Sequence, residues 1–171
     1  MRKNLLLLLT VLTLLSCSDS NNKLLDNLQT AVTDGEVGSK GYKEVQLADL
    51  TDFEWDTLYY FQAGEDKRVI SDAIGFRWEG EPVPQLSRRL LFVHQGKVAS
   101  FVDYNYREFP LVVYGCNQDR WVYPKSRTRF ATFKYCARGD TATYTLIPVN
   151  CVENLREQIG QKCPDEAVAA K

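Results

Sequence analysis

Three side chains in the sequence have the type and spacing needed for acid–base chemistry, beginning with a pair of carboxylates. Glu54 and Asp56 lie two residues apart in the segment FEWDTLYYF (53–61), so on a β-strand both would project from one face. Two carboxylates with separated pKa values can perform general acid–base catalysis, including glycoside cleavage. The alternative is that a partly exposed strand face carries acidic residues, and that Asp56 pairs with an arginine.

The third side chain is His94, the only histidine in the chain. Histidine is the usual general base near neutral pH, but His94 lies beside a predicted turn, which favours a solvated turn residue. No serine lies in a G-x-S-x-G elbow, and no glycine-rich phosphate loop is present. We therefore predict a protein without catalytic residues or a cofactor. A cell-wall hydrolase that uses the carboxylate pair is the alternative.

Aromatic and basic residues concentrate in two segments, FVDYNYREFP (101–110) and RWVYPKSRTRF (120–130). Tyr, Trp and Arg carry much of the binding energy at protein interfaces, and aromatic rings also bind sugars. The composition predicts a binding surface formed by Tyr104, Tyr106, Arg107, Trp121 and Tyr123. The alternative is that half of these rings belong to the core. Basic residues nearby could instead meet anionic lipid headgroups: Arg127, Arg129 and Lys134.

Four cysteines lie in the second half of the chain: Cys116, Cys136, Cys151 and Cys163. An even number in an exported chain predicts two disulfides, for which three pairings exist. We favour Cys116–Cys136 and Cys151–Cys163, because each pair brackets a short segment that could fold back on itself. A zinc site is not expected, since the chain has no C-x-x-C motif and one histidine.

The N-terminus has the layout of a secretion signal. Arg2 and Lys3 precede an apolar run, Leu5–Leu15, which is too short to cross roughly 30 Å of hydrocarbon as a helix. The tetrapeptide Leu14-Leu15-Ser16-Cys17 that follows resembles the lipobox of bacterial lipoproteins. The resemblance implies cleavage before Cys17, lipidation of the Cys17 thiol and acylation of the new amine. A plain secreted protein is the alternative.

Lipidation of Cys17 would anchor the protein to the cell envelope, because each buried CH₂ of an acyl chain contributes about 0.8 kcal/mol. In many lipoproteins, aspartate directly after the lipidated cysteine retains the protein in the inner membrane. Here Ser18 holds that position and Asp19 follows. The resemblance therefore implies the outer membrane, facing the periplasm.

Charge and composition limit the possible partners of residues 17–171. The 21 basic residues of the chain include Arg2 and Lys3, so the remainder has three more acidic than basic residues. This charge balance does not indicate nucleic-acid binding, and we expect no nucleic-acid partner. The expected partners are the membrane, through the lipid on Cys17, and a protein of the periplasm.

The chain divides into three parts on these grounds: a signal peptide (1–16), a lipidated N-terminus with a flexible tether (17–41) and a folded domain (42–171). The tether contains a short helical pattern in NNKLLDNLQTAV (21–32). In the domain we expect a strand from Phe53, a short helix ending at Gly75 and a hairpin around 94–97. A second hairpin turning at Gly139-Asp140 and a terminal helix capped by Asn150 follow.

These elements predict an α+β fold: a single small domain with an antiparallel sheet, short flanking helices and two disulfides. The segment FEWDTLYYF also resembles an F-x-W-D-x-[LV]-Y-x-F motif of small exported or lipid-anchored bacterial proteins of unknown function. Its matching positions are Phe53, Trp55, Asp56, Leu58, Tyr59 and Phe61. The resemblance implies a shared start to the fold and no particular activity.

Overall fold

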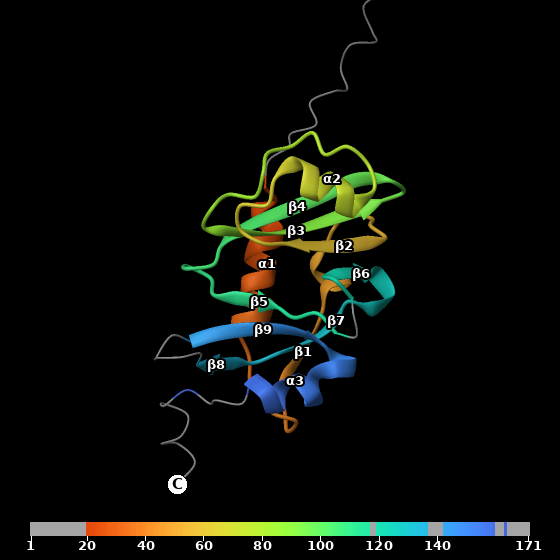
Figure 1. The fold of residues 1–171 in the computed structure, drawn as a ribbon. Coiled ribbons are helices and arrows are strands. Elements are labelled where there is room, and N and C mark those ends of the chain that lie inside the picture. The colour runs from red at the N-terminus through yellow and green to blue at the C-terminus, as the bar shows by residue number, and fades with distance from the viewer. Residues whose placement is uncertain (1–19, 117–118, 137–141, 160–162, 164–171) are drawn as a thin grey trace, which may run out of the picture.

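The computed structural model describes residues 20–116, 119–136, 142–159 and Cys163, and it shows two sheets that lie one above the other (Figure 1). The first sheet has the order β4 (Lys97–Asn105), β3 (Ser87–His94), β2 (Thr57–Phe61) and β6 (Val122–Pro124). The second sheet has the order β1 (Lys43–Gln46), β7 (Arg129–Thr132), β9 (Ala142–Pro148) and β5 (Leu111–Val113), and β8 (Lys134–Cys136) also pairs with β9.

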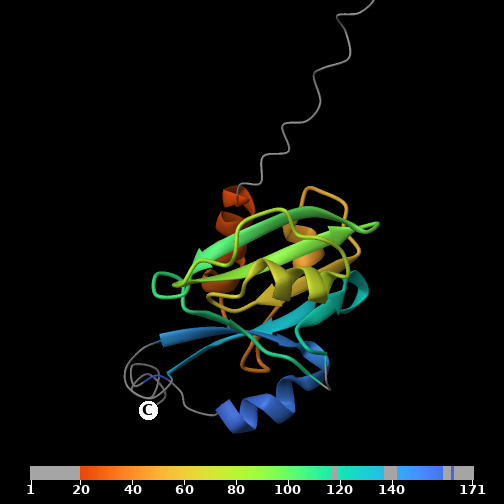
Figure 2. The ribbon, with the colours of Figure 1, turned by 45° about the horizontal axis from the view of Figure 1, so that its top comes forward.

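Three α-helices in the described part of the chain pack around these sheets: α1 (Asn22–Thr33), α2 (Lys67–Ile74) and α3 (Val152–Ile159). In both views α2 covers the outer side of the first sheet and α3 lies under the second (Figures 1 and 2). Short 3₁₀ turns occupy Leu47–Leu50, Lys125–Arg127 and Val149–Cys151. The expected α+β class, with antiparallel sheets, flanking helices and two disulfides, is confirmed.

The first sheet is antiparallel throughout and is buried on both faces. Its hairpin, β3–β4, turns at Gln95 and Gly96, which have φ angles of 48° and 73°. Positive φ at both central positions gives the turn a twist that matches the flanking strands. Along β3, Leu90 and Phe92 enter the core between the sheets, whereas Leu91 and Val93 face α2. The near-continuous apolar run of β3 follows from this double burial.

The second sheet contains one parallel pair that the sequence did not indicate. β7 and β8 both pair antiparallel with β9, and the register of the pairing is the same for both. They therefore act as one strand of a hairpin with β9, interrupted after Thr132. β5 lies on the opposite edge of β9 and runs parallel to it, with Val113 opposite Leu146. The turn expected at Gly139-Asp140 lies outside the described residues.

Three apolar clusters hold the layers together. The main cluster lies between the sheets and includes residues of both, among them Phe92 and Phe130. A second cluster joins α2 to the first sheet through Ile70, and a third joins α3 to the second sheet through Val152. Each outer helix therefore covers a sheet face that would otherwise expose apolar side chains to water.

Helix α1 belongs to the folded domain, so the predicted tether boundary at residue 41 is wrong for this segment. Leu24, Leu28 and Val32 are at most 4 % exposed and lie in the main cluster. Asn21 caps the helix by accepting a hydrogen bond from the Leu24 N–H. The error arose because polar and glycine-rich flanks resemble a linker, while only packing shows that this apolar face is needed to cover the core.

Two other local predictions need correction. The strand begins at Thr57 instead of Phe53, and Phe53 and Trp55 pack with Leu58 in the main cluster. The terminal helix is entered through the 3₁₀ turn Val149–Cys151, so Asn150 does not cap it.

Within the described ranges, the helices are too short or too polar to cross a bilayer.

Candidate functional site

The two disulfides join Cys116 to Cys151 and Cys136 to Cys163, so the predicted pairing is wrong. The Cα atoms are 6.1 Å apart in the first pair and 4.9 Å apart in the second. The predicted lipidation site, Cys17, lies outside the described residues.

Strand order explains why Cys116 pairs with Cys151. Cys116 follows β5 and Cys151 follows β9. Because these two neighbouring strands are parallel, their C-terminal ends lie at the same end of the sheet. Cys136, in contrast, lies in β8 on the other side of β9, opposite Ala142 at the far end of that strand. Two strand spacings, about 9.5 Å, exceed the Cα separation that a disulfide can bridge.

The structure brings Asp56 and His94 together but gives both a role in the hairpin turn. Asp56 Oδ2 accepts a hydrogen bond from the Gln95 N–H at 2.6 Å, and Asp56 Oδ1 lies 3.2 Å from His94 Nδ1. The Gln95 hydrogen bond is the main cause of a lowered pKa at Asp56, which His94 and Lys125 lower further. Glu54 points to solvent and pairs with Lys125. The predicted partner of Asp56, an arginine, is therefore replaced by the turn itself.

The five residues of the predicted binding surface do not form one surface. Tyr104 and Tyr123 are 1 % and 0 % exposed, and their hydroxyls donate to the Leu111 and Tyr114 carbonyls. Both are core residues with a satisfied polar tip, because the alternation of side chains along β4 and β6 places them between the sheets. Tyr106 is half-buried beneath the Arg88 guanidinium, and Arg107 is exposed.

Trp121 keeps the exposure that the prediction required, at 43 %. It precedes β6, whereas Tyr106 and Arg107 follow β4 at the opposite edge of the same sheet. Two intervening strands separate these edges by about 14 Å. The sequence could not supply this separation, because it depends on the strand order.

The backbone around Trp121 is held in an uncommon conformation. Arg120 and Trp121 have φ angles of 47° and 58°, in the left-handed region that bulky residues rarely adopt. Such a position costs of order 1–3 kcal/mol and persists only where surrounding contacts fix it. Here the Tyr60 N–H donates to the Trp121 carbonyl at 3.0 Å, and the two rings meet edge to face at 6.4 Å. The exposed indole is therefore pre-positioned.

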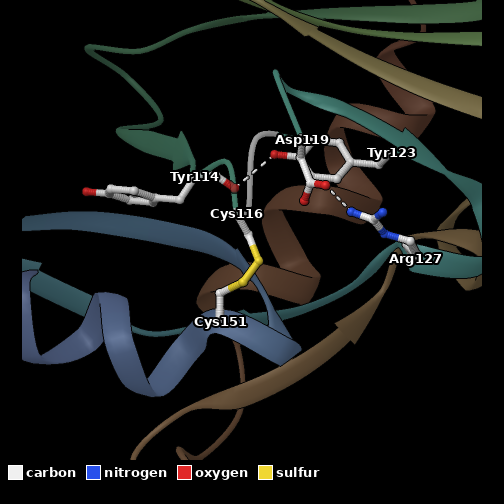
Figure 3. Close-up of a disulfide and its surroundings, with 6 residues drawn as sticks. All are labelled: Tyr114, Cys116, Asp119, Tyr123, Arg127 and Cys151. Atoms are coloured by element: carbon white, nitrogen blue, oxygen red, sulfur yellow. Dashed lines mark hydrogen bonds and ion pairs between the residues drawn. A yellow bond between two sulfur atoms is a disulfide. The ribbon is translucent and has the colours of Figure 1, made fainter.

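A cavity of about 510 Å³ opens on the same loop, beside the Cys116–Cys151 disulfide. Its polar lining consists of Asp119, Ser126, Arg127, Arg129 and Asn150. Cys116, Pro148 and Val149 complete the wall. Figure 3 shows Asp119 between the disulfide and the Arg127 guanidinium. We call this space the Asp119 cavity.

Asp119 has an incomplete set of partners for a buried carboxylate. Its side chain is 6 % exposed, and Oδ1 accepts a hydrogen bond from Arg127 Nη2. Oδ2 is buried and has no hydrogen-bond partner among the described residues. An unsatisfied buried acceptor costs about 1–3 kcal/mol, and more when it is charged. Asp119 is thus an exception to the rule that buried polar atoms are paired.

The buried Asp119 carboxylate and the Glu44 carboxylate each affect a neighbouring side chain, Tyr123 and Arg129 respectively. Burial raises the pKa of Tyr123, and the nearby Asp119 carboxylate raises it further, so this phenol stays protonated as the donor to the Tyr114 carbonyl. Arg129 is half-exposed and pairs through Nε with Glu44 Oε2 at 2.7 Å. Among the described residues, no group of three or more His, Cys, Asp or Glu side chains is arranged to hold a metal ion.

The sequence indicates Arg127 and Arg129 as candidate residues but not Asp119, Ser126 and Asn150. Arg127 and Arg129 stood out because they follow aromatic residues in a basic segment. Asp119 carried no signal, since an acid in a polar loop is ordinary. Its surroundings combine the loop after β5 with the 3₁₀ turns Lys125–Arg127 and Val149–Cys151, which lie far apart in the chain, so no local pattern contains them.

Comparisons with protein-family models, with curated proteins and with solved structures found no match for this chain.

Proposed function

We propose that the protein is a lipid-anchored envelope protein that works as a non-catalytic binding module for another protein of the periplasm. The anchor is the lipid on Cys17, as the lipobox-like tetrapeptide implies, and Ser18 in place of aspartate directly after Cys17 favours the outer membrane. An inhibitor or immunity-type protein and an accessory of an envelope assembly are the two forms that this proposal takes.

The single observation that carries the proposal is the pre-positioned Trp121. It is a large exposed aromatic residue whose backbone lies in a strained left-handed conformation, beside Arg120. Tryptophan and arginine dominate interface hot spots, and a rigid anchor loses little conformational entropy on binding. Asp56, in contrast, has both carboxylate oxygens engaged by the hairpin turn, which gives less support to the hydrolase alternative.

In-cell cross-linking followed by mass spectrometry tests the binding role. We expect one stoichiometric partner, and Trp121→Ala should weaken its capture by about 2 kcal/mol or more, equivalent to about 30-fold in affinity. Leu86→Ala is the matched control, because Leu86 is also exposed, at 41 %, but lies elsewhere on the surface. Failure to recover any partner at several cross-linker lengths, or equal losses with both variants, would contradict the proposal.

Membrane fractionation tests the anchor separately. Cys17→Ser removes the thiol that the lipid requires, so the variant should move from the membrane fraction to the soluble periplasmic fraction or keep its uncleaved signal. Metabolic labelling with a clickable fatty acid should label the wild-type chain and not the variant. Labelling of both, or of neither, would contradict lipidation at Cys17.

A further inference from the structure

The Asp119 cavity contains an acceptor that the protein itself leaves unused. Asp119 lines the cavity, and its Oδ2 atom is buried without a hydrogen-bond partner among the described residues. The other carboxylate oxygen, Oδ1, already accepts a hydrogen bond from Arg127 Nη2. A ligand that donates to Oδ2 would complete the carboxylate, and a charged donor would do so most strongly because charge-assisted hydrogen bonds are the strongest kind.

The same cavity also presents cationic donors. Arg127 uses one N–H for Asp119, and Arg129 uses its Nε–H for Glu44. Both side chains are about half exposed, so their remaining N–H groups are accessible to a ligand. A guanidinium edge matches a carboxylate in shape and charge. The cavity thus offers an acceptor for a cation and donors for an anion.

The charges at the cavity balance. Asp119 offsets the charge of Arg127 through one ion pair, and Glu44 offsets the charge of Arg129 through another. A ligand with a net charge would leave this balance uncompensated, whereas a ligand with one positive and one negative end would not. A volume of about 510 Å³ suits a small molecule.

We propose that the Asp119 cavity binds a small zwitterion, a short peptide with free ends, whose ammonium donates to Asp119 Oδ2 and whose carboxylate meets Arg129 and Arg127. This site is additional to the protein-binding role assigned to Trp121, and its ligand would be held without a chemical step.

Isothermal titration calorimetry of the detergent-solubilised full-length chain tests the assignment with three forms of one dipeptide. Alanylalanine carries both charges, its N-acetyl derivative lacks the ammonium, and its carboxyl-amide lacks the carboxylate. We expect saturable binding of alanylalanine, and each blocked form should bind about tenfold to a hundredfold more weakly, as for loss of one hydrogen bond to a charged group. Glucose and inorganic phosphate serve as probes for a neutral polyol and a simple anion.

Two variants assign each end of the peptide. Asp119→Asn removes the negative charge and one of the two acceptor oxygens, so it should weaken alanylalanine binding to the level of the N-acetyl derivative, with no further loss when variant and derivative are combined. Arg129→Gln should do the same for the carboxyl-amide. Asp72→Asn is the matched control, because Asp72 also pairs with an arginine, Arg68, but is exposed on α2. It should leave binding unchanged.

Three results would overturn the proposal: no saturable binding of alanylalanine by the folded wild-type chain, equal binding of the N-acetyl derivative, or tighter binding of glucose or phosphate. The comparison of ligand forms on the wild-type chain remains decisive even if Asp119→Asn fails to fold. Partner capture through Trp121 is measured separately, so failure here leaves the proposed function intact.

Discussion

At the scale of single residues, Asp56 shows that a carboxylate whose position in the sequence suggests catalysis can have a structural role in the folded protein. Its two oxygens bind the Gln95 N–H and approach His94, and its backbone N–H donates to the Val93 carbonyl at 2.7 Å. The turn at Gln95 and Gly96 requires positive φ angles, and Asp56 satisfies the donor that this turn leaves unpaired. The residue therefore stabilises the β3–β4 hairpin from the start of β2.

The lowered pKa of Asp56 predicts a pH-dependent contribution to stability. A carboxylate whose pKa is lower in the folded state stabilises the fold above its unfolded value of about 4 and loses this effect as pH falls through the folded value. Asp56→Asn should therefore reduce the thermal midpoint at pH 7, and the difference from wild type should shrink between about pH 5 and pH 2. Glu54→Gln is the control. A difference that stays constant down to pH 2 would contradict this role.

At the scale of elements, the covering of each sheet face decides which segments belong to the domain. The loop between α2 and β3 is fixed by Arg89, whose side chain is 2 % exposed and binds Asp103 through two N–H groups at 2.7 Å each. Arg89 also donates to the Glu81 carbonyl and lies 4.5 Å from the Phe101 ring centroid. With a further hydrogen bond to the Pro82 carbonyl, four of the five guanidinium N–H groups have an acceptor, and the group also lies 5.2 Å from the Trp78 ring centroid.

Removing one partner of this pair should be strongly destabilising. Asp103→Asn leaves the buried Arg89 charge uncompensated and should lower the free energy of unfolding by about 3–5 kcal/mol. Asp72→Asn removes a carboxylate from the exposed Arg68 pair and should cost at most about 0.5 kcal/mol. Urea denaturation measures both values. Similar costs for the two variants would show that burial of the Arg89 pair does not matter.

Helix α1 provides a second test at this scale, because a tether and a core helix respond differently to truncation. Leu28 is 0 % exposed in the main cluster, so Leu28→Ala should lower the free energy of unfolding by about 2–5 kcal/mol. Leu25→Ala, on the half-buried side of the same helix, should cost less. If urea denaturation found no effect of Leu28→Ala, residues 22–33 would be a tether after all.

At the scale of the whole molecule, the disulfides join elements that are distant in the chain. Cys116–Cys151 closes a separation of 35 residues, and Cys136–Cys163 closes one of 27. Both bonds lie around β9, so they connect the strands of the second sheet with the segments that follow it. The first bond also borders the Asp119 cavity, whose wall therefore depends on it.

Non-reducing peptide mapping should recover Cys116 linked to Cys151 and Cys136 linked to Cys163. Trypsin separates all four cysteines, in peptides 108–120, 135–138, 139–156 and 163–171. Replacing both members of one bond by serine should cost about 3–4 kcal/mol in the chain-entropy account. Replacing Cys116 and Cys136 together should cost more, because both bonds are lost. Recovery of peptide 108–120 joined to 135–138 would refute this connectivity.

Much of the fold could be predicted from local patterns. The periodicity of 67–74 with Gly75 after it predicted α2, and the β-rich runs around 94–97 predicted the β3–β4 hairpin. The helical spacing of Leu24, Leu28 and Val32 also predicted α1, though not its burial. These features depend on backbone preferences and side-chain spacing within a few residues, so the sequence contains them directly.

The candidate site could be predicted only in part. Trp121 was predicted from its residue type, and it is exposed. Tyr104 and Tyr123 were predicted on the same ground, but they are core residues. Asp119 gave no signal. Type alone cannot separate an exposed ring from a buried one, because alternation on a strand leaves open which face is covered.

The sequence by itself determined the helices, the main hairpin, the α+β class and the presence of four cysteines for two disulfides. Only the tertiary structure decided that β5 runs parallel to β9, and this one pairing brings Cys116 to Cys151 and closes the Asp119 cavity. The physical reason is that strand order is set by which faces and edges can be covered together across the whole chain. Contacts of that kind depend on the packing of both sheets and all three helices, and no short stretch of residues specifies them.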